Sequence, residues 1–148
     1  IKGLLYVAKA VSQLMINENN SAVCKGHIIN MGSVAAKDIY EKGNVYSGTK
    51  AAVDAISHAM RVDLLRHHIK VTCIHPGAAE TEFSLVRFKG DEGTANSIYN
   101  GLTPLTAEDL GGVIYYFATL PDHVCINHLT LTCTRQADGI YFNRSAGV

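Results

Sequence analysis

Apolar residues recur along this chain with two different periods, which predict helices and strands in alternation. A helical period runs from residue 1 to about 17, where Leu4, Ala8, Val11 and Met15 share one face. Other apolar side chains cover much of the rest of this helix, so we expect a sheet and a second subunit to bury it on two sides. The helix begins at the first residue without a capping residue, so we expect the chain to be part of a longer protein.

A strand, a long helix and a second strand follow. A polar loop is predicted for residues 17–26, and residues 27–31 have the apolar run of a buried strand, which Gly32 and Ser33 end. Asn44 is the expected cap of a helix that continues to about residue 67, and residues 69–74 indicate the next buried strand, broken by His75-Pro76-Gly77. This order predicts a βαβ unit with parallel strands.

The second half of the chain is less regular. Residues 80–101 mix apolar and charged side chains and are expected to form short helices or a loop that covers a pocket. Thr106 is the predicted cap of a helix that ends near Thr119, and residues 129–132 alternate like a last strand. The tail beyond Thr134 carries little pattern. The whole order of elements indicates an α/β fold.

Composition excludes several classes of partner. Of 148 residues, 47% are hydrophobic, and 13 Lys plus Arg balance 13 Asp plus Glu, so no bulk charge favours nucleic acid or an anionic membrane. No apolar run approaches the ~20 residues of a membrane span, and we expect a soluble, cytoplasmic protein. The four cysteines lack paired spacing, so free thiols are expected, and the seven histidines lack the spacing of metal ligands, so no metal is expected.

Tyr46 and Lys50 stand four residues apart on the predicted long helix and therefore share one face. A nearby cation favours the ionised form of a tyrosine hydroxyl, which could then act as general acid or base; the alternative is an ordinary surface pair. Ligands of open parallel sheets bind beyond the carboxyl ends of the strands. Ser33 follows one strand, Pro76-Gly77 ends the next, and Tyr46 starts the helix between them, so we expect all of them at one site.

Ser33, Tyr46-x-x-x-Lys50 and the later Pro76-Gly77-x-x-x-Thr81, in this order, resemble the short-chain dehydrogenase/reductase family. The resemblance covers essentially the whole chain, as roughly the C-terminal three-fifths of a single domain. It implies a Rossmann-type doubly wound parallel sheet with helices on both faces, here truncated at its N-terminal, phosphate-binding half. The Gly-rich phosphate loop of that family does not occur in these residues, so they alone should bind cofactor poorly.

The resemblance also implies roles for individual residues. Tyr46 would exchange a proton with the substrate, Lys50 would bind the nicotinamide ribose and assist Tyr46, and Ser33 would hydrogen-bond the reacting oxygen. The residues expected at the cofactor are Asn30, Met31, Gly32, Tyr46, Lys50, Pro76, Gly77, Ala79 and Thr81. The chemistry implied is hydride transfer, and no metal is required for it.

Residues 81–91 resemble one branch of the family, the NADP-dependent 3-hydroxy acid dehydrogenases. This implies NADP, with NAD as the alternative, and a small hydroxy acid or oxo acid as substrate. Arg87, between Val86 and Phe88, is our candidate clamp for the substrate carboxylate, against the alternative of a surface arginine. His75 stands where the family frequently has Asn, and it is either a pocket donor or, as we favour, a satisfied structural histidine.

Two other functions compete with an oxidoreductase. A catalytically silent relative that senses cofactor or serves as a scaffold is disfavoured by the intact Ser33, Tyr46 and Lys50, and the same spacing disfavours another open-sheet fold such as a methyltransferase. We also expect a homodimer or homotetramer, built through the first helix and the helix from residue 44 to 67, because both carry more apolar surface than one sheet face can cover.

Overall fold

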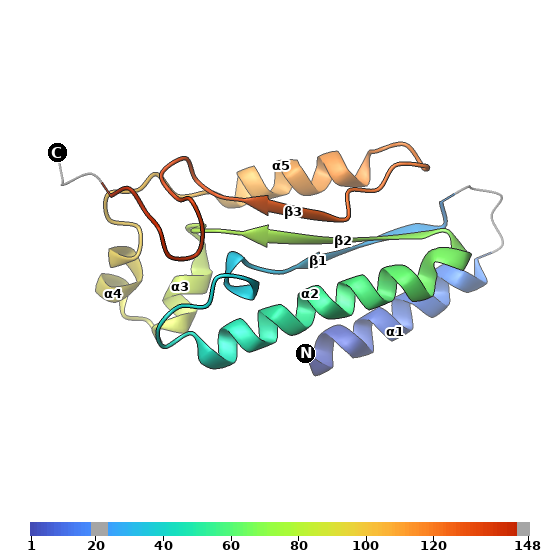
Figure 1. Ribbon diagram of the computed structural model, residues 1–148, viewed down its shortest axis with the longest axis horizontal. Coiled ribbons are helices and arrows are strands. Elements are labelled where there is room, and N and C mark those ends of the chain that lie inside the picture. Colours follow the sequence, from blue (N-terminus) through green and yellow to red (C-terminus); the bar gives the residue numbers. More distant parts are fainter. Residues whose placement is uncertain (19–23, 145–148) are drawn as a thin grey trace.

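The computed structural model describes residues 1–18 and 24–144 and shows a parallel sheet between layers of helices (Figure 1). In chain order the elements are α1 (Lys2–Asn17), β1 (Gly26–Met31), η1 (Val34–Ala36), α2 (Asn44–Leu64), η2 (Leu65–His67), β2 (Ile69–Pro76), α3 (Glu82–Arg87), α4 (Glu92–Ser97), α5 (Ala107–Ala118) and β3 (His128–Leu131). Helices α1 and α2 lie side by side on one face of the sheet and α5 lies on the other. The predicted α/β fold with helices on both faces is therefore confirmed.

The sheet has the order β1-β2-β3, and both pairings are parallel. Gly26 pairs with Ile69 at the start of β1, and Cys73 pairs with His128 at the start of β3. All strands therefore end at the same edge, where η1, α3 and α4 also lie, at the left of Figure 1. This is the edge at which the sequence predicts a site.

The core lies between the sheet and the two long helices. Leu64, Ile69 and Val71 are buried, and Met15 from α1 and Met60 from α2 pack against them. Fully burying an aliphatic side chain of this kind contributes about 1.5–3 kcal/mol, so this cluster fixes α2 and β2 against each other. The face of α1 predicted to point inward is the one that meets the core, since Leu4, Ala8, Val11 and Met15 are all half-buried.

The start of α2 differs from the prediction. Gly43, and not Asn44, holds the cap position, and its carbonyl accepts a hydrogen bond from the Ser47 amide at 2.7 Å. A Cβ on residue 43 would lie 2.8 Å from the Tyr40 ring, so the close approach of that ring requires glycine here. Asn44 is the first helical residue instead, and its side chain accepts from the Val45 amide at 2.6 Å.

Strand β2 also differs, because it continues through His75 and Pro76 instead of ending before them. His75 pairs with Thr130 and Pro76 with Leu131, so β3 extends the sheet beside the residues that were expected to break it. Proline is tolerated at this position because it is the last residue of the strand. Residues 19–23 of the predicted polar loop lie outside the described residues.

Three other predictions are confirmed. Thr106 caps α5, with a reciprocal pair of hydrogen bonds between Thr106 and Asp109. Cys24, Cys73, Cys125 and Cys133 carry free thiols. Residues 80–101 contain the two short helices α3 and α4. Within the described ranges, no helix combines the length and apolar character that crossing a membrane requires.

Candidate active site

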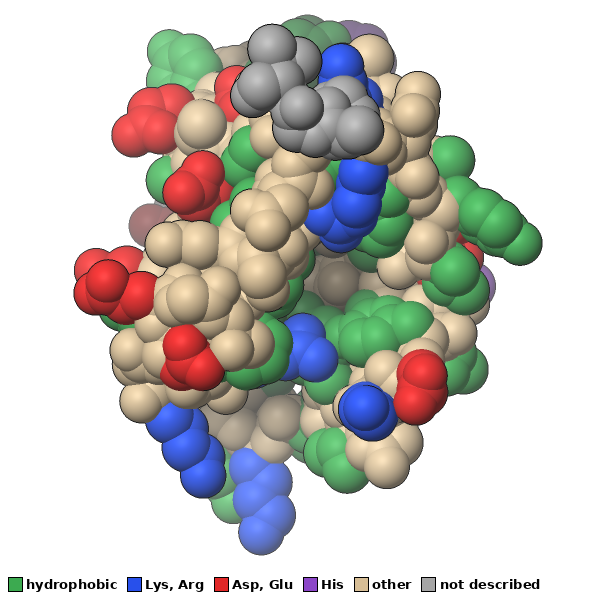
Figure 2. Space-filling model, turned by 90° about the vertical axis from the view of Figure 1, so that its left-hand side faces the viewer, with side chains coloured by type: hydrophobic (Ala, Val, Ile, Leu, Met, Phe, Trp, Pro, Cys, Tyr) green, Lys and Arg blue, Asp and Glu red, His purple; other side chains and the backbone are tan. Residues whose placement is uncertain are grey.

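A cavity of about 540 Å³ opens at the carboxyl ends of β1 and β2, between the start of α2, the short helix α3 and the residues Ile98 and Tyr99 that follow α4. Figure 2 looks onto this edge and shows hydrophobic and basic side chains around a hollow. The predicted site residues that line the cavity are Met31, Gly32, Ser33, Tyr46, Lys50, Pro76, Gly77, Ala79, Thr81 and Arg87. The structure therefore brings together residues that are up to 56 positions apart in the sequence, from Met31 to Arg87.

Helix α2 presents Tyr46 and Lys50 to this cavity from successive turns. The Lys50 ammonium lies 5.8 Å from the centroid of the Tyr46 ring and donates a hydrogen bond to the Met31 carbonyl at 2.9 Å. Burial lowers the pKa of Lys50 below its ordinary value, an effect that Cys73 partly opposes. Because an ammonium has three N–H groups, Lys50 can be held at the end of β1 and still bind a ligand.

Ser33 lies just beyond β1, is 8% exposed and has an extended backbone. Its hydroxyl oxygen accepts a hydrogen bond from the Ala35 amide at 3.1 Å and so caps η1. Its carbonyl accepts from the Ala36 amide at 3.0 Å. Since the Ala35 amide occupies a lone pair of the hydroxyl, the hydroxyl proton can be donated to a ligand oxygen.

Arg87, the last residue of α3, lies on the cavity wall and close to Tyr46. Its guanidinium carbon is 5.6 Å from the centroid of the Tyr46 ring and 5.9 Å from that of Tyr40, and Nη1 donates to the Tyr40 hydroxyl at 3.3 Å. A guanidinium carries five N–H donors, so this contact leaves several for a ligand. Arg87 is exposed to solvent and also lines the cavity, so its role as a clamp for the substrate carboxylate stays a prediction.

Two residues from the sequence prediction lie beneath the cavity instead of on its wall. Asn30 is buried, and its side chain donates to the Ser57 hydroxyl at 2.9 Å, so its part in cofactor binding stays a prediction. His75 is 0% exposed, and its two ring nitrogens lie 3.1 Å from the Ser33 carbonyl and 3.1 Å from an Asp54 carboxylate oxygen. It is a satisfied structural histidine, as favoured from the sequence, and not a pocket donor.

Several residues of the cavity carry no signal in the sequence. Gln136, in the tail that showed little pattern, accepts from the Ala78 amide at 2.7 Å, and a Cβ on residue 77 would overlap its side chain. The Tyr99 hydroxyl contacts the Ser84 hydroxyl at 2.6 Å and donates to the Ala79 carbonyl at 2.8 Å, which fixes α3 over the end of β2. These bonds join segments far apart in the chain, so no local pattern could have revealed them.

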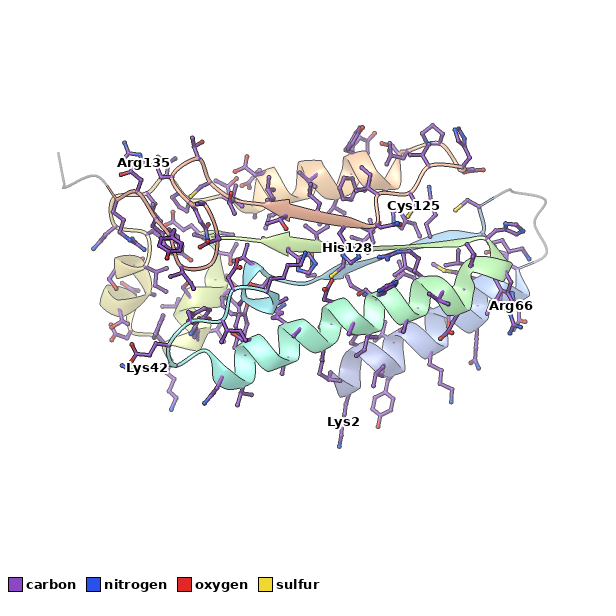
Figure 3. All side chains as sticks on the ribbon, viewed as in Figure 1. Lys2, Lys42, Arg66, Cys125, His128 and Arg135 are labelled. Atoms are coloured by element: carbon purple, nitrogen blue, oxygen red, sulfur yellow. The ribbon has the colours of Figure 1, made fainter. Side chains whose placement is uncertain are left out.

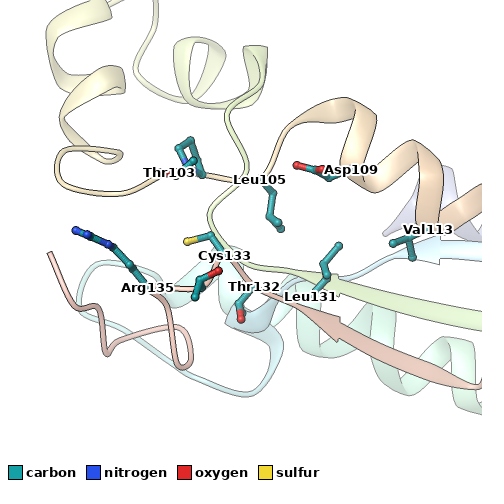
Figure 4. Close-up of a pocket in the computed structure, with 10 residues that line it drawn as sticks. Thr103, Leu105, Asp109, Val113, Leu131, Thr132, Cys133 and Arg135 are labelled. Atoms are coloured by element: carbon teal, nitrogen blue, oxygen red, sulfur yellow. The ribbon is translucent and has the colours of Figure 1, made fainter. Parts of the chain in front are cut away.

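A second cavity, of about 630 Å³, lies between α5 and the end of β3 (Figure 4). Leu105, Val113 and Leu131 give it apolar walls, and Asp109 is already engaged in the cap of α5. None of the site residues predicted from the sequence lines it. Of these two cavities, the predicted acid–base groups Tyr46 and Lys50 therefore line only the first.

Comparison with known proteins agrees with this geometry. The family model for short chain dehydrogenases matches residues 1–91. Sulfoacetaldehyde reductase 2 of Chromohalobacter salexigens is 43% identical over 137 residues, which make up 93% of this chain and 53% of that protein. The NADP-dependent 3-hydroxy acid dehydrogenase YdfG of Escherichia coli is 44% identical over 137 residues, 92% of this chain and 53% of that protein.

Two solved structures are also similar to most of this chain and to about half of their own length. The closed form of serine dehydrogenase complexed with NADP+ is similar over 99% of this chain and 55% of that chain, with a TM-score of 0.85 and 42% identity. Serine dehydrogenase from Escherichia coli is similar over 92% of this chain and 50% of that chain, with a TM-score of 0.71 and 34% identity. The chain thus spans about half the length of these proteins.

Proposed function

This chain belongs to the short chain dehydrogenase family, and from that premise we propose that the whole protein transfers hydride between a nicotinamide cofactor and a small hydroxy acid or oxo acid. The observation that carries the proposal is that Ser33, Tyr46 and Lys50 line one cavity, with Arg87 beside Tyr46 on its wall. The chain would supply the catalytic part of a single Rossmann-type domain, and the phosphate-binding part would lie elsewhere in the whole protein.

Each polar group has a separate task in this chemistry. Reduction of a carbonyl needs one hydride and one proton, and the Tyr46 hydroxyl would give the proton to the carbonyl oxygen. The Ser33 hydroxyl donates a hydrogen bond to the same oxygen, which stabilises the charge that develops there. The Lys50 ammonium, 5.8 Å from the Tyr46 ring, stabilises the phenolate left behind. In the oxidation direction the same groups act in reverse.

The residues present fit the nicotinamide half of a cofactor. A cavity of about 540 Å³ is within the usual size range of ligand sites, and Lys50 keeps N–H groups for ribose hydroxyls beyond its bond to Met31. When bound, the cofactor supplies or accepts the hydride. Gly32, Pro76, Gly77, Ala79 and Thr81 would form its walls, with Asn30 behind them. We propose NADP because the similar 3-hydroxy acid dehydrogenase is named as NADP-dependent, and NAD is the alternative.

The proposed substrate class rests on Arg87. The names of two similar proteins, a sulfoacetaldehyde reductase and a 3-hydroxy acid dehydrogenase, both denote a small substrate that carries an anionic group near an alcohol or aldehyde. A guanidinium can bind a carboxylate or sulfonate through two parallel hydrogen bonds. From its place beside Tyr46, Arg87 would orient such a substrate so that its reacting oxygen meets Tyr46 and Ser33.

The test compares Arg87→Ala with Arg66→Ala in the whole protein. Both variants lose one guanidinium, but Arg66 lies at the far end of the molecule from the cavity (Figure 3). A charge-assisted hydrogen bond contributes roughly 1.5–3 kcal/mol, so Arg87→Ala should lower kcat/KM for a 3-hydroxy acid about 10- to 150-fold. An uncharged alcohol should lose far less, and Arg66→Ala should lose nothing with either substrate.

The outcomes separate the parts of the proposal. Equal losses for the acid and the alcohol would remove Arg87 from the substrate site and leave the hydride-transfer proposal intact. A whole protein that binds NADP in a fluorescence titration, yet turns over no hydroxy acid, oxo acid or alcohol, would instead favour the catalytically silent relative. No binding of either nicotinamide cofactor would contradict the proposed function itself.

A further inference from the structure

A chain of four polar side chains runs beneath the cavity and ends on the backbone of Ser33. Arg61 Nη1 lies 3.4 Å from His128 Nε2, and His128 Nδ1 lies 3.2 Å from Asp54 Oδ1. The same Asp54 oxygen lies 3.1 Å from His75 Nε2, and His75 Nδ1 lies 3.1 Å from the Ser33 carbonyl oxygen. Asp54 and Arg61 stand two turns apart on α2, and the two histidines come from the neighbouring strands β2 and β3. Figure 3 labels His128.

The carbonyl at the end of this chain fixes one proton on His75. A carbonyl oxygen only accepts hydrogen bonds, so His75 Nδ1 must carry a proton and donate it to the Ser33 carbonyl, while Nε2 hydrogen-bonds the Asp54 carboxyl group. His128 donates from Nδ1 to Asp54 and accepts from the Arg61 guanidinium at Nε2, so it is neutral; burial, and then Arg61, lower its pKa.

The position of the His75 ring is fixed closely. The side chain is fully buried, and its ring stacks on His128 with centroids 6.0 Å apart. A Cβ on residue 32 would lie 2.6 Å from His75 Nδ1, so only glycine before Ser33 lets the ring reach the Ser33 carbonyl. Other charged groups near the ring are Lys50 on α2 and Lys37 after η1, which act on its neighbours Cys73 and His128.

A metal ion does not explain the arrangement better. Asp54, Cys73 and His75 offer ligand atoms within 4.8 Å of one another. Asp54 and His75 already bond each other, however, and both ring nitrogens of His75 are occupied. Burial raises the pKa of the Cys73 thiol, whereas a metal ligand must be a thiolate.

We propose that His75, held by Asp54, is a positioning residue for Ser33: its Nδ1–H group fixes the Ser33 carbonyl and thereby the hydroxyl that binds the reacting oxygen. The inference rests on the proposed function, because it takes the Ser33 hydroxyl to bind substrate. Without the His75 bond, the Ser33 carbonyl keeps only the Ala36 amide at 3.0 Å, and the serine gains freedom to move. Catalysis is sensitive to such loosening because the reacting groups must be held in a narrow range of geometry.

Two variants of His75 in the whole protein separate its two contacts. The amide nitrogen of Asn can replace Nδ1, so His75→Asn keeps a donor for the Ser33 carbonyl and loses the bond to Asp54. The longer Gln side chain replaces Nε2, so His75→Gln keeps the bond to Asp54 and loses the donor for Ser33. We expect kcat to fall about tenfold or more in His75→Gln and less than about threefold in His75→Asn, with NADP affinity unchanged in both. A role in packing alone predicts the opposite order, since Asn is the smaller side chain.

Asp54→Ala tests the hold on His75 and leaves the imidazole itself unchanged. Without the carboxylate, His75 Nε2 loses its partner at 3.1 Å, and the ring gains freedom to turn away from the Ser33 carbonyl. We expect kcat to fall about tenfold, as in His75→Gln, and to fall no further once Ser33 is Ala. Full turnover in Asp54→Ala would overturn the part assigned to Asp54.

A double-variant cycle with Ser33→Ala measures whether His75 affects kcat through Ser33. If His75 acts through Ser33, then His75→Gln should cost nothing further once Ser33 is Ala; an additional tenfold loss in that background would overturn the proposal. If Ser33→Ala alone retained full turnover, the catalytic assignment of the proposed function would fail first. If Ser33→Ala removed turnover while His75→Gln had no effect, only the inference about His75 would fail. Activity lost with EDTA and restored by Zn²⁺ would make the cluster a metal site and contradict the proposal.

Discussion

The two long helices, α1 and α2, lie side by side on one face of the sheet but differ in how far the described chain covers them (Figure 1). Helix α2 buries Ser47, Ser57 and Leu64 against η1 and the strands. Helix α1 buries no residue, and Tyr6, Val7 and Leu14 are each more than 60% exposed. Both helices are amphipathic and both expose apolar side chains, Val45 and Val62 on α2 among them, yet only α2 buries residues within the described chain.

This difference between α1 and α2 separates conclusions that rest on the described residues from conclusions that depend on a second subunit or on other parts of the whole protein. The inner face of α2 carries Tyr46, Lys50, Asp54 and Arg61, and each of them has its contacts within the described chain. The outer face of α1 exposes large apolar side chains, which a second subunit or another part of the whole protein would cover. The chemistry assigned to α2 can therefore be tested residue by residue, whereas the role of α1 is tested by assembly.

The largest expected effect is a loss of turnover, and it tests the catalytic role assigned to Tyr46 on α2. Tyr46→Phe removes only the phenolic oxygen, and because general acid–base groups contribute about 10²–10⁴-fold, kcat of the whole protein should fall by that factor. The affinity for NADP should be nearly unchanged, since the ring and Lys50 remain. The measurement is steady-state turnover together with a cofactor titration by fluorescence.

Tyr116→Phe is the matched control, since it removes the same atom from an exposed tyrosine on α5. It should retain full activity. Turnover of Tyr46→Phe at the level of the unaltered protein would show that another group moves the proton.

A smaller effect is expected on assembly, and it tests whether a second subunit covers the exposed face of α1. Val7 and Leu14 stand seven residues apart and therefore on one face, 62% and 73% exposed. If a second subunit covers them, Val7→Asp with Leu14→Asp loses the burial of two apolar side chains, about 1.5–3 kcal/mol each. The dissociation constant of the oligomer should then rise at least about 100-fold, which sedimentation equilibrium at micromolar concentration would detect.

Ile39→Asp is the control for this experiment, because it places the same charge at an exposed apolar residue outside both helices. It should leave the mass unchanged. A strictly monomeric mass for the active, unaltered protein would contradict the predicted homodimer or homotetramer.

The smallest effect is expected on the pH dependence of the free energy of unfolding, through His27 on β1 and His128 on β3. Burial lowers the pKa values of His27 and His128 below 6.5, with Lys70 adding to the effect on His27 and Arg61 to that on His128. The unfolded chain then binds protons at a higher pH than the folded chain does. This stabilising contribution is present above about pH 6.5 and is lost as the pH falls through the lowered folded pKa values.

Urea unfolding of the whole protein at about pH 7.5 and pH 5.5 should show this loss of free energy of unfolding. His27→Gln should make the loss smaller, whereas His123→Gln, at an exposed position, should not change it. A free energy of unfolding that stayed constant between these pH values would argue against lowered pKa values of His27 and His128 in the folded chain.

Local pattern predicted the strand, helix and strand around the site because the apolar periods of residues 27–31, 44–67 and 69–74 are long and regular. It misplaced the cap of α2, since the choice of Gly43 depends on the packing of the Tyr40 ring and not on capping preference. It missed Gln136, whose side chain bonds the Ala78 amide 58 positions away. Contacts of that range depend on the folded topology, which neither periodicity nor residue preference encodes.

The β1 edge has a consequence for handling the chain by itself. Within the described residues β1 pairs only with β2, so the backbone groups on the other edge of Gly26–Met31 have no partner strand, although the Met31 carbonyl accepts from Lys50. Such an edge is a template for strands of other molecules, and the apolar pair Ile28 and Ile29 with no charged neighbour on the strand adds to the hazard. Produced alone, residues 1–148 should therefore aggregate through this edge, and a strand that pairs with β1 in the whole protein would also protect it in the cell.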